Sequence, residues 1–546
     1  MGLLEKAQQR KQEISEKPKD SELSILKDIP KELKASKKAH SGTKVKNEIQ
    51  KDLADKKSGF GWKGLANRKI AFDSSINEYK YEVSEPNLNE EELKTKNELV
   101  HLFKMLADIN VFDMDKEEKK KYLEETLNQI IIDNDVKFEA GSKDKIFYHI
   151  FRDFIGYGKI DILMNDEGIE DISCDGHQVP VFIYHKKYDA ITTNICFKDA
   201  DELDSFVVRL SQISGKQISI YSPIVDGKLP DGSRLQTTLA KTVTKGSTFT
   251  IRKFRENPLT PIDLINFGSM SVDMAAYFWM AIENGASILF CGGTASGKTS
   301  ALNALSLFIP SSHKIVSIED TREVSLPHKN WIAGTTRQGF SSSEENKTGK
   351  DIDMFDLIRA ALRQRPRVII VGEVRGKEAY SLFQAMATGH TSYATVHAST
   401  IHTLIQRLEN PPISLPRALL TSLDIIVFQN AIDLGGKTTR RMTSVTEVIK
   451  LDPDTNQLIF MEPFSWVSKT DDRFESTGTS KILNNIKLQN DWSDEQLKRE
   501  LESRKLILEW MRKKDVGNYK DVGKIISDYH RFPEILINRA KGEMKK

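Results

Sequence analysis

The chain of 546 residues opens with a long polar stretch and then shows apolar positions at helical spacing. Residues 1–58 are rich in Lys, Glu, Ser and Gln and poor in aromatic side chains, so we expect a disordered basic tail. A solvated tail is favoured over an arm that docks to a partner or a membrane surface. Residues 59–155 are predicted to be a mainly helical N-terminal region, with helices over 89–110, 119–132 and 142–154.

The pattern changes at residue 156, where short apolar runs are separated by turn residues. Strands are expected at 168–176, 181–184 and 248–254, with one helix over 201–213 packed against them. These elements predict an α+β N-terminal domain over residues 156–258. Two prolines, Pro258 and Pro261, then mark a linker at 255–268.

From residue 268 to 430, short apolar strands alternate with helices. Strands that are apolar throughout and alternate with helices predict a parallel sheet covered on both faces. The expected fold class is therefore α/β. Its predicted strands are 287–291, 314–318, 368–371 and 393–396, with helices at 272–284, 353–364 and 376–388. A β/helical region is expected over 431–546, with helices at 493–512 and near 525–537.

Composition narrows the class of protein only modestly. The net charge of +2 offers no global electrostatic argument for nucleic-acid binding, and we expect no direct nucleic-acid partner. Three scattered cysteines cannot form a disulfide framework or a Cys₄ zinc module, which fits a reducing cytoplasm. Without an apolar run of about 18 residues, any work at a membrane is expected to be peripheral and held by a partner.

The strongest motif is a phosphate-binding loop. Gly292 to Thr299 reads G-x-x-x-x-G-K-T, directly after an apolar strand and directly before helix-forming residues. Backbone N–H groups of such a loop cradle phosphate oxygens at a helix N-terminus. Lys298 is expected on the β- and γ-phosphates of ATP and Thr299 on Mg²⁺. The expected nucleotide-binding residues of the loop are Gly292, Gly293, Thr294, Ala295, Ser296, Gly297, Lys298, Thr299 and Ser300.

Polar residues follow three other predicted strands of the same sheet. Glu319 begins an acidic turn, Glu373 follows the apolar run 368–371, and His397 ends the run 393–396. In an open parallel sheet, ligands sit at the carboxyl ends of the strands, so these side chains should face the phosphates. A carboxylate there can position water around Mg²⁺ or act as base toward the attacking water. We expect Glu373 in either role, and the choice of general base between Glu319 and Glu373 stays open.

These motifs together resemble those of the secretion ATPase superfamily, the hexameric motors of type II and type IV secretion and type IV pili. The residues that carry the resemblance are the loop at 292–299, Ile318–Glu323, Val371–Arg375 and Gly389–Ala398. The basic tail, the absent Cys₄ module and Asn410-Pro411-Pro412 look more like the archaeal branch, which powers archaella and archaeal pili.

The resemblance implies a RecA-like P-loop ATPase that uses Mg²⁺, with Glu319 and Glu373 around the attacking water and His397 near the γ-phosphate. It also implies that Arg234 and Arg252 approach the nucleotide from the N-terminal domain. The expected assembly is a homohexamer, cytoplasmic and peripheral at the inner face of the membrane. Its expected partners are a multispan platform protein and, through it, filament subunits. The alternative is a nucleic-acid-stimulated RecA-like ATPase such as a helicase or packaging motor, which would need a basic, aromatic-bearing groove.

Overall fold

The computed structural model describes residues 51–52, 65–74, 77–106, 116–240, 243–254, 257–337 and 351–544. The tail at 1–58 lies outside the described residues except for Lys51–Asp52, which form the short strand β1. The chain divides into two compact units: Met1–Asp166 with Pro180–Cys196, and Glu167–Val179 with Phe197–Lys546. The five segments expected from the sequence are finer than this division and stay a prediction.

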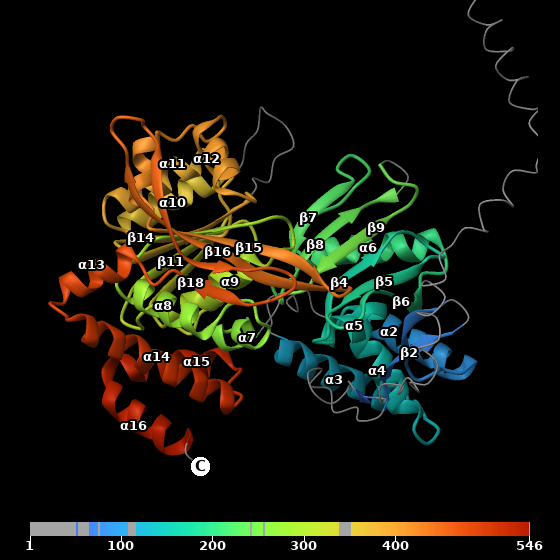
Figure 1. The fold of residues 1–546 in the computed structure, drawn as a ribbon. Helices are drawn as coiled ribbons and strands as arrows, with labels where there is room; N and C mark the ends of the chain where they lie inside the picture. The colour runs from blue at the N-terminus through green and yellow to red at the C-terminus, as the bar shows by residue number, and fades with distance from the viewer. Residues whose placement is uncertain are drawn as a thin grey trace, which may run out of the picture. The chain divides into compact units, whose positions relative to one another are not determined.

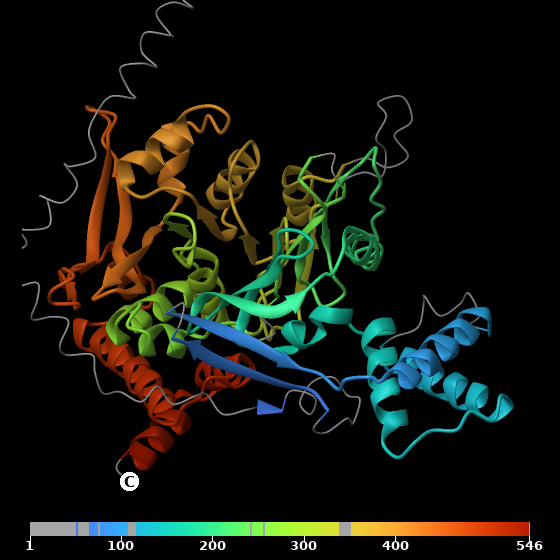
Figure 2. The ribbon, with the colours of Figure 1, turned by 90° about the vertical axis from the view of Figure 1, so that its right-hand side faces the viewer.

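Three helices of the first unit confirm the helical pattern read from the sequence. They are α2 (Glu90–Leu106), α3 (Lys116–Asp133) and α4 (Ser142–Phe154), followed by the short η4 (Gly158–Ile160) and α5 (Asp161–Asn165). Leu99, Leu127 and Ile150 are fully buried where the three long helices pack together. The three helices lie close together (Figure 2), and their buried apolar side chains form one core.

The first unit also holds strands that we did not expect in a mainly helical region. A hairpin joins β2 (Asn67–Asp73) and β3 (Glu78–Ser84), and it continues in the order β1-β2-β3-β6-β5 with β5 (Pro180–His185) and β6 (Asp189–Cys196). β3 runs parallel to β6, with Tyr81 opposite Thr193. Tyr81 is fully buried, and its hydroxyl donates to Asp166 at 2.7 Å.

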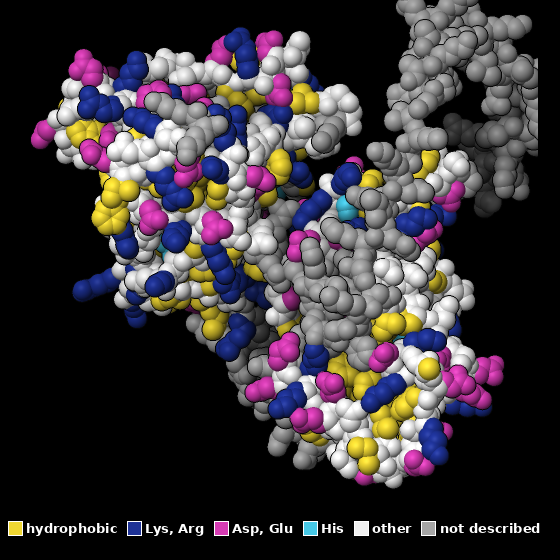
Figure 3. All heavy atoms as spheres, turned by 90° about the horizontal axis from the view of Figure 1, so that it is seen from below, with side chains coloured by type: hydrophobic (Ala, Val, Ile, Leu, Met, Phe, Trp, Pro, Cys, Tyr) yellow, Lys and Arg dark blue, Asp and Glu magenta, His cyan; other side chains and the backbone are white. Residues whose placement is uncertain are grey.

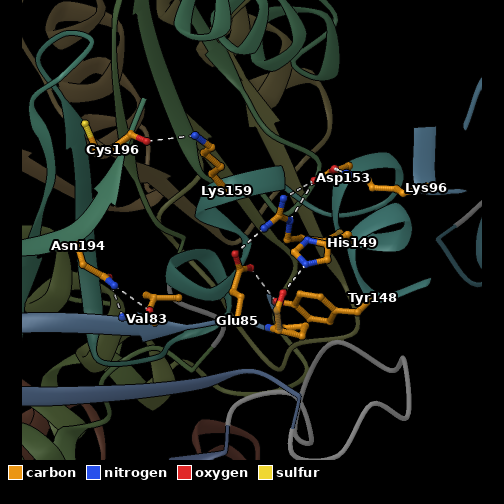
Figure 4. A network of polar contacts seen from close by, with 11 residues as sticks. Val83, Glu85, Lys96, Tyr148, His149, Asp153, Lys159, Asn194 and Cys196 are labelled. Atoms are coloured by element: carbon orange, nitrogen blue, oxygen red, sulfur yellow. Dashed lines mark hydrogen bonds and ion pairs between the residues drawn. The ribbon is translucent and has the colours of Figure 1, made fainter. Parts of the chain in front are cut away.

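A network of charged side chains ties the end of β3 to α2 and α4 (Figure 4). Glu85 accepts from the Tyr148 hydroxyl at 2.8 Å and from Arg152 at 2.5 Å. Arg152 also pairs with Asp153 at 2.8 Å, and Lys96 of α2 pairs with the other oxygen of Asp153 at 2.7 Å. Burial acts to raise the pKa of Asp153, but the two cations hold it below its usual value. The hairpin is therefore anchored to the helices by paired, half-buried charges.

The second unit contains a small sheet in the order β4-β9-β8-β7. Its strands are β4 (Ile169–Cys174), β9 (Thr248–Arg252), β8 (Arg234–Thr238) and β7 (Ile224–Lys228), all paired antiparallel in the three ladders of this order. Buried and exposed residues alternate along β9, with Phe249 and Ile251 inside. The helix α6 (Ala200–Ile213) packs on this inner face, where Phe206 meets Phe249.

The large sheet of this unit has nine strands in the order β12-β11-β13-β14-β10-β15-β16-β17-β18. In this order, each neighbouring pair from β12 to β15 is parallel, as expected, and each pair from β15 to β18 is antiparallel. The strands are β10 (Ile288–Cys291), β11 (Ile315–Glu319), β12 (Trp331–Thr335), β13 (Val368–Val371), β14 (Thr391–Val396), β15 (Ile425–Leu434), β16 (Lys437–Leu451), β17 (Leu458–Trp466) and β18 (Phe474–Ser476). The expected boundary at residue 430 falls inside β15, so this sheet continues past it.

Two helical layers cover the large sheet, and successive residues of each central strand point into them alternately. In β10, Ile288 and Phe290 enter one core, while Leu289 and Cys291 enter the other. The first core lies under α7 (Pro261–Asn266), α8 (Val272–Glu283), α9 (Lys298–Leu305), η6 (Ser306–Phe308) and the C-terminal helices. The second lies under α10 (Met354–Arg363), α11 (Glu378–Ala387), α12 (Ile401–Glu409) and η7 (Arg417–Ser422) (Figure 1).

The C-terminal end of the chain forms four helices, where the sequence suggested two. They are α13 (Lys481–Gln489), α14 (Asp494–Lys513), α15 (Tyr519–Arg531) and α16 (Pro533–Met544). The helix expected near 525–537 is divided, because Phe532 leaves helical geometry and Pro533 starts a new helix. α14 packs along α8, so these helices complete the first core of the large sheet.

Candidate functional site

The phosphate-binding loop follows a fully buried strand and leads into α9. All four residues of β10 are buried, and Lys298 is the first residue of the helix. Two glycines are required by close approach: a Cβ at Gly292 would lie 2.0 Å from the carbonyl oxygen of Gln429, and one at Gly297 would meet Arg440. Gly297 also has φ +90°, a left-handed conformation that glycine tolerates best.

Four polar side chains form a continuous line beside this loop. Lys298 Nζ donates to the carbonyl of Gly293 at 2.5 Å and lies 3.5 Å from Nδ1 of His397. His397 Nε2 lies 3.2 Å from one carboxylate oxygen of Glu373, and Arg375 donates to the other at 2.5 Å. A neutral His397 with its proton on Nε2 satisfies both neighbours. The sheet edge therefore brings together Lys298, Glu373 and His397, as the sequence predicted.

The pKa shifts along this line follow from burial and from the alternation of charge. Burial lowers the pKa of Lys298, and Glu373 partly opposes that shift. Burial, reinforced by the positive charge of Lys298, also lowers the pKa of His397, so the imidazole is neutral at pH 7. For Glu373 burial acts to raise the pKa, but the Arg375 guanidinium and its other cationic neighbours bring it below the usual value. From Lys298 to Arg375, the four side chains are therefore a cation, a neutral imidazole, a carboxylate and a cation.

Glu319 occupies a different environment at the end of β11. Its side chain is only 1% exposed, and one carboxylate oxygen accepts the backbone N–H groups of Glu323 and Val324 at 2.8 and 2.9 Å. The other oxygen is buried without a hydrogen-bond partner among the described residues. Burial raises the pKa of Glu319 to about 7, although the two backbone donors oppose that shift. A carboxyl that titrates near neutrality is suited to proton transfer.

The residues present fit a magnesium nucleotide. The Thr299 hydroxyl makes no hydrogen bond to another described side chain, and the open carboxylate oxygen of Glu319 points to an unfilled polar contact. In the described part of the chain, no group of three or more His, Cys, Asp or Glu side chains could hold a metal ion alone. Mg²⁺ at this edge would therefore take Thr299, Glu373 or both, with phosphate oxygens and water as its other ligands. Its chemical contribution would be to neutralise phosphate charge.

The two arginines expected to approach the nucleotide lie on the outer face of the small sheet. Arg234 pairs with Asp226 at 2.7 Å, and Arg252 pairs with Asp171 at 3.1 Å. Each arginine is thus paired with an acid of its own sheet, and this pairing argues against a contact with the nucleotide. Arg234 nevertheless lies close enough to Asp320 and Arg375 of the large sheet for both charges to act on its pKa. Their role toward a nucleotide stays a prediction.

Several residues at the site were not identified from the sequence. Glu378, at the start of α11, accepts the backbone N–H groups of Arg375 and Gly376 at 2.6 and 2.7 Å and so shapes the turn after Glu373. Next to this turn is an open cleft of about 430 Å³, lined by Asp320, Thr336, Arg337, Asp351, Ile352, Asp353, Met354, Glu373, Arg375, Gly376 and Glu378. On the other side of the loop, Arg440 of β16 donates to the carbonyl of Ala295 at 3.1 Å.

A parallel α/β sheet, a glycine loop that leads into a helix, and carboxylates at the neighbouring strand ends define a P-loop nucleotide-binding protein. Comparison with known proteins narrows this class. Residues 163–483 match the Type II/IV secretion system protein family, and the chain belongs to that family. No helix in the described part of the chain is both long enough and apolar enough to cross a bilayer.

Individual relatives come from archaea and bacteria. An uncharacterized protein of Methanocaldococcus jannaschii, MJ0900, is 38% identical over 398 residues, which cover 72% of this chain and 71% of the relative. The type IV secretion system protein PtlH of Bordetella pertussis is 30% identical over 264 residues, 42% of this chain and 76% of PtlH. Among solved structures, the Brucella suis VirB11 ATPase of a type IV secretion system shows 23% identity and a TM-score of 0.27. That alignment covers 53% of this chain and 91% of VirB11.

Proposed function

We propose that the chain is a Mg²⁺-dependent ATPase that powers protein secretion or the assembly or rotation of an archaeal type IV pilus-like filament. The observation that carries the proposal is the line Lys298–His397–Glu373 beside the phosphate-binding loop, in a chain of the Type II/IV secretion system family. Lys298 would bind the β- and γ-phosphates. His397 would lie near the γ-phosphate, because its neutral imidazole does not repel the phosphate charge.

The chemistry required is an in-line attack of water on the γ-phosphate. Glu319 and Glu373 are the two carboxylates that could take the proton of that water, and they differ in their hydrogen-bond partners and in their pKa. Glu373 is paired with Arg375 and His397. Among the described residues, Glu319 has one oxygen without a hydrogen-bond partner, and its pKa is about 7. This contrast favours Glu319 as the base and Glu373 as the residue that orients the water or Mg²⁺.

The experiment that tests the activity is ATP hydrolysis by the purified full chain, wild type against Lys298→Ala. The lysine charge stabilises phosphate oxygens in the transition state, so its removal should reduce turnover by at least 100-fold. Circular dichroism should be unchanged, because the Lys298 side chain contacts the loop and His397 and is not part of either apolar core. Hydrolysis by Lys298→Ala at the wild-type rate would contradict the proposal.

We further propose a homohexamer with ATP at or near the subunit boundaries, acting peripherally at the inner face of the membrane on a multispan platform protein. Arg234, Arg375 and Arg337 supply cations near the acidic cleft beside Glu373, where charge from a neighbouring subunit could also enter. Light scattering at micromolar protein with Mg²⁺ and a non-hydrolysable ATP analogue tests the assembly. A protein that stays monomeric under these conditions would contradict it.

Stimulation assays separate the motor from a nucleic-acid-dependent ATPase. On the face in Figure 3, Lys and Arg side chains are interspersed with Asp and Glu over the described surface. A mixed surface of this kind does not favour binding to a polyanionic backbone. If the chain acts as a motor at the membrane, acidic lipid vesicles should raise the ATPase rate more than single-stranded DNA or RNA does. The reverse order would favour the nucleic-acid-stimulated enzyme.

A further inference from the structure

An arginine reaches the phosphate-binding loop from the strand pair β15 and β16. Arg440 Nε donates to the carbonyl oxygen of Ala295 at 3.1 Å. That bond anchors the guanidinium by its inner nitrogen. Among the described residues, its two outer nitrogens have no hydrogen-bond or ion-pair partner. The side chain is exposed, and directly opposite it on β15 stands Ala431, whose single methyl group leaves this face of the hairpin open.

The position of Arg440 relative to the loop is fixed by backbone packing. A Cβ at Gly292 would lie 2.0 Å from the carbonyl oxygen of Gln429 on β15, so the start of the loop sits directly against that strand. A Cβ at Gly297 would lie 3.1 Å from Cδ of Arg440, so the end of the loop sits against the arginine stem. Both glycines of the loop therefore pack against the hairpin formed by β15 and β16.

The polarity of the site indicates which part of a nucleotide meets Arg440. β10 lies between β14 on one side and β15 on the other. The residues that would face the γ-phosphate, namely Lys298, His397 and Glu373, lie on the β14 side. A triphosphate held in the loop with its γ end toward β14 must direct its nucleoside toward β15 and β16.

We infer that Arg440 is a further nucleotide-binding residue that contacts the nucleoside of the bound nucleotide, its guanidinium plane lying against the base. This inference rests on the proposed function. A guanidinium is planar and always charged, and it stacks on aromatic faces. Its hydrogen bond to Ala295 holds the group in place before the nucleotide arrives, so little side-chain freedom is lost on binding. Lys298 thus serves the phosphate end and Arg440 the nucleoside end.

The test separates nucleoside binding from phosphate binding. Calorimetric titration of the full chain with AMP-PNP, ADP and inorganic tripolyphosphate, each with Mg²⁺, is carried out on wild type and Arg440→Ala. Stacking by a cation on a base corresponds to about tenfold in affinity, so Arg440→Ala should weaken AMP-PNP and ADP alike by about tenfold. Binding of tripolyphosphate, which has no nucleoside, should be unchanged. Arg473→Ala is the matched control, because it removes an exposed arginine directly before β18, the edge strand of the same sheet.

Two results would overturn the inference while leaving the proposed ATPase in place. One is wild-type affinity of Arg440→Ala for AMP-PNP and ADP; the other is an equal loss for tripolyphosphate, which would mean that Arg440 acts through the shape of the loop. Should Arg440→Ala fail to fold, Arg440→Lys keeps the charge and removes only the planar group, and the same pattern of losses is expected. A wild-type chain that binds neither AMP-PNP nor ADP would overturn the proposed function and this inference with it.

Discussion

Arg234 and Arg252 stand directly opposite each other on β8 and β9, two like charges on one exposed face of the small sheet. Lys228 of β7 faces Arg234 in the same row, so three cations follow one another across three strands. Like charges in directly opposed positions destabilise a sheet, and Asp226 and Asp171 offset that cost by pairing with one arginine each. Burial lowers the pKa of Lys228, and the charges of Glu319 and Asp320 at the end of β11 partly oppose that shift. The cationic row therefore lies within electrostatic reach of the acids that follow β11.

We expect Arg234→Ala and Arg252→Ala to reduce ATP turnover with little effect on stability. Both side chains are at least half exposed and form surface ion pairs, so each loss should change the free energy of unfolding by less than about 1 kcal/mol. An arginine that neutralises transition-state charge is worth on the order of 1,000-fold or more in turnover. Steady-state kinetics with thermal melting as the stability check decides between the two roles. If both variants turn over ATP at the rate of the control Arg473→Ala, the arginines serve only as ion-pair partners within their own sheet.

Glu373→Gln should retain nucleotide binding and lose turnover. The amide keeps the shape and can still accept from His397, but it cannot carry the charge that orients water or Mg²⁺. We expect a fall in kcat of about 100-fold or more, with the Kd for AMP-PNP within threefold of wild type. Single-turnover kinetics and calorimetry measure the two quantities separately. Loss of AMP-PNP binding only when Mg²⁺ is present would instead assign Glu373 to the metal.

Much of the large sheet could be predicted from the sequence, because its signals are local. Strands that are apolar throughout, such as Val368–Val371, are typical of a sheet covered on both faces. The helix expected at Ser142–Phe154 has those bounds in the structure, since its apolar stripe is strong and continuous. The order of the loop, the carboxylates and His397 at successive strand ends likewise predicted that Lys298, His397 and Glu373 would meet.

Features set by distant partners could not be read in this way. Tyr79, Tyr81 and Val83 alternate with charged residues, a strand pattern that was available, but β3 is stabilised by pairing with β6 more than 100 residues later. The continuation of β15 past Asn430 depends on its ladder with β16. Arg440 is the clearest case at the site, because its partner is a backbone carbonyl of Ala295, and no side-chain pattern reports such a contact.

The raised pKa of Glu319 predicts a pH-dependent stability. In the folded chain this carboxyl titrates near pH 7, whereas the pKa of an unfolded glutamate is about 4.5. Between these values the folded state holds the extra proton, so stability falls as pH rises from about 4.5 to 7 and is level above that. Glu319→Gln removes this loss and should be more stable than wild type at pH 8, by on the order of 2 kcal/mol, with the difference vanishing near pH 4.5.

Thermal melting of wild type and Glu319→Gln across this pH range measures the effect. Glu323→Gln leaves the backbone N–H that Glu319 accepts but removes a charge that helps to raise the pKa of Glu319, so its stability should depend less on pH than that of wild type. The same titration should appear in catalysis if Glu319 is the base: kcat should rise to a plateau above pH 7, and Glu319→Gln should lose most of its activity. An active Glu319→Gln enzyme would leave proton transfer to Glu373.

The last prediction concerns the ion pairs that hold the C-terminal helices on α8 and the large sheet. Glu283, the final residue of α8, pairs with Arg504 of α14 at 2.7 Å and with His530 of α15 at 2.8 Å. Arg504 is almost fully buried and lies over the ring of Trp279. Burial acts to raise the pKa of Glu283, but His530 and Arg504 lower it to about 2. Because this pKa is depressed, the stabilisation is present above about pH 4.5 and is lost as pH falls toward 2.

Arg504→Met keeps the apolar stem and removes the charge, leaving Glu283 with a single partner. Breaking a buried pair in this way costs about 3 kcal/mol, so α14 and α15 should open far more readily. Hydrogen exchange of peptides from α8, α14 and α15 measures that opening directly. Arg539→Met, which removes an exposed i,i+4 pair on α16, is the control and should change exchange by less than about 1 kcal/mol. Equal exchange in the two variants would mean that apolar packing alone holds these helices, and Glu283→Gln would then show the same decline as wild type between pH 4.5 and 2.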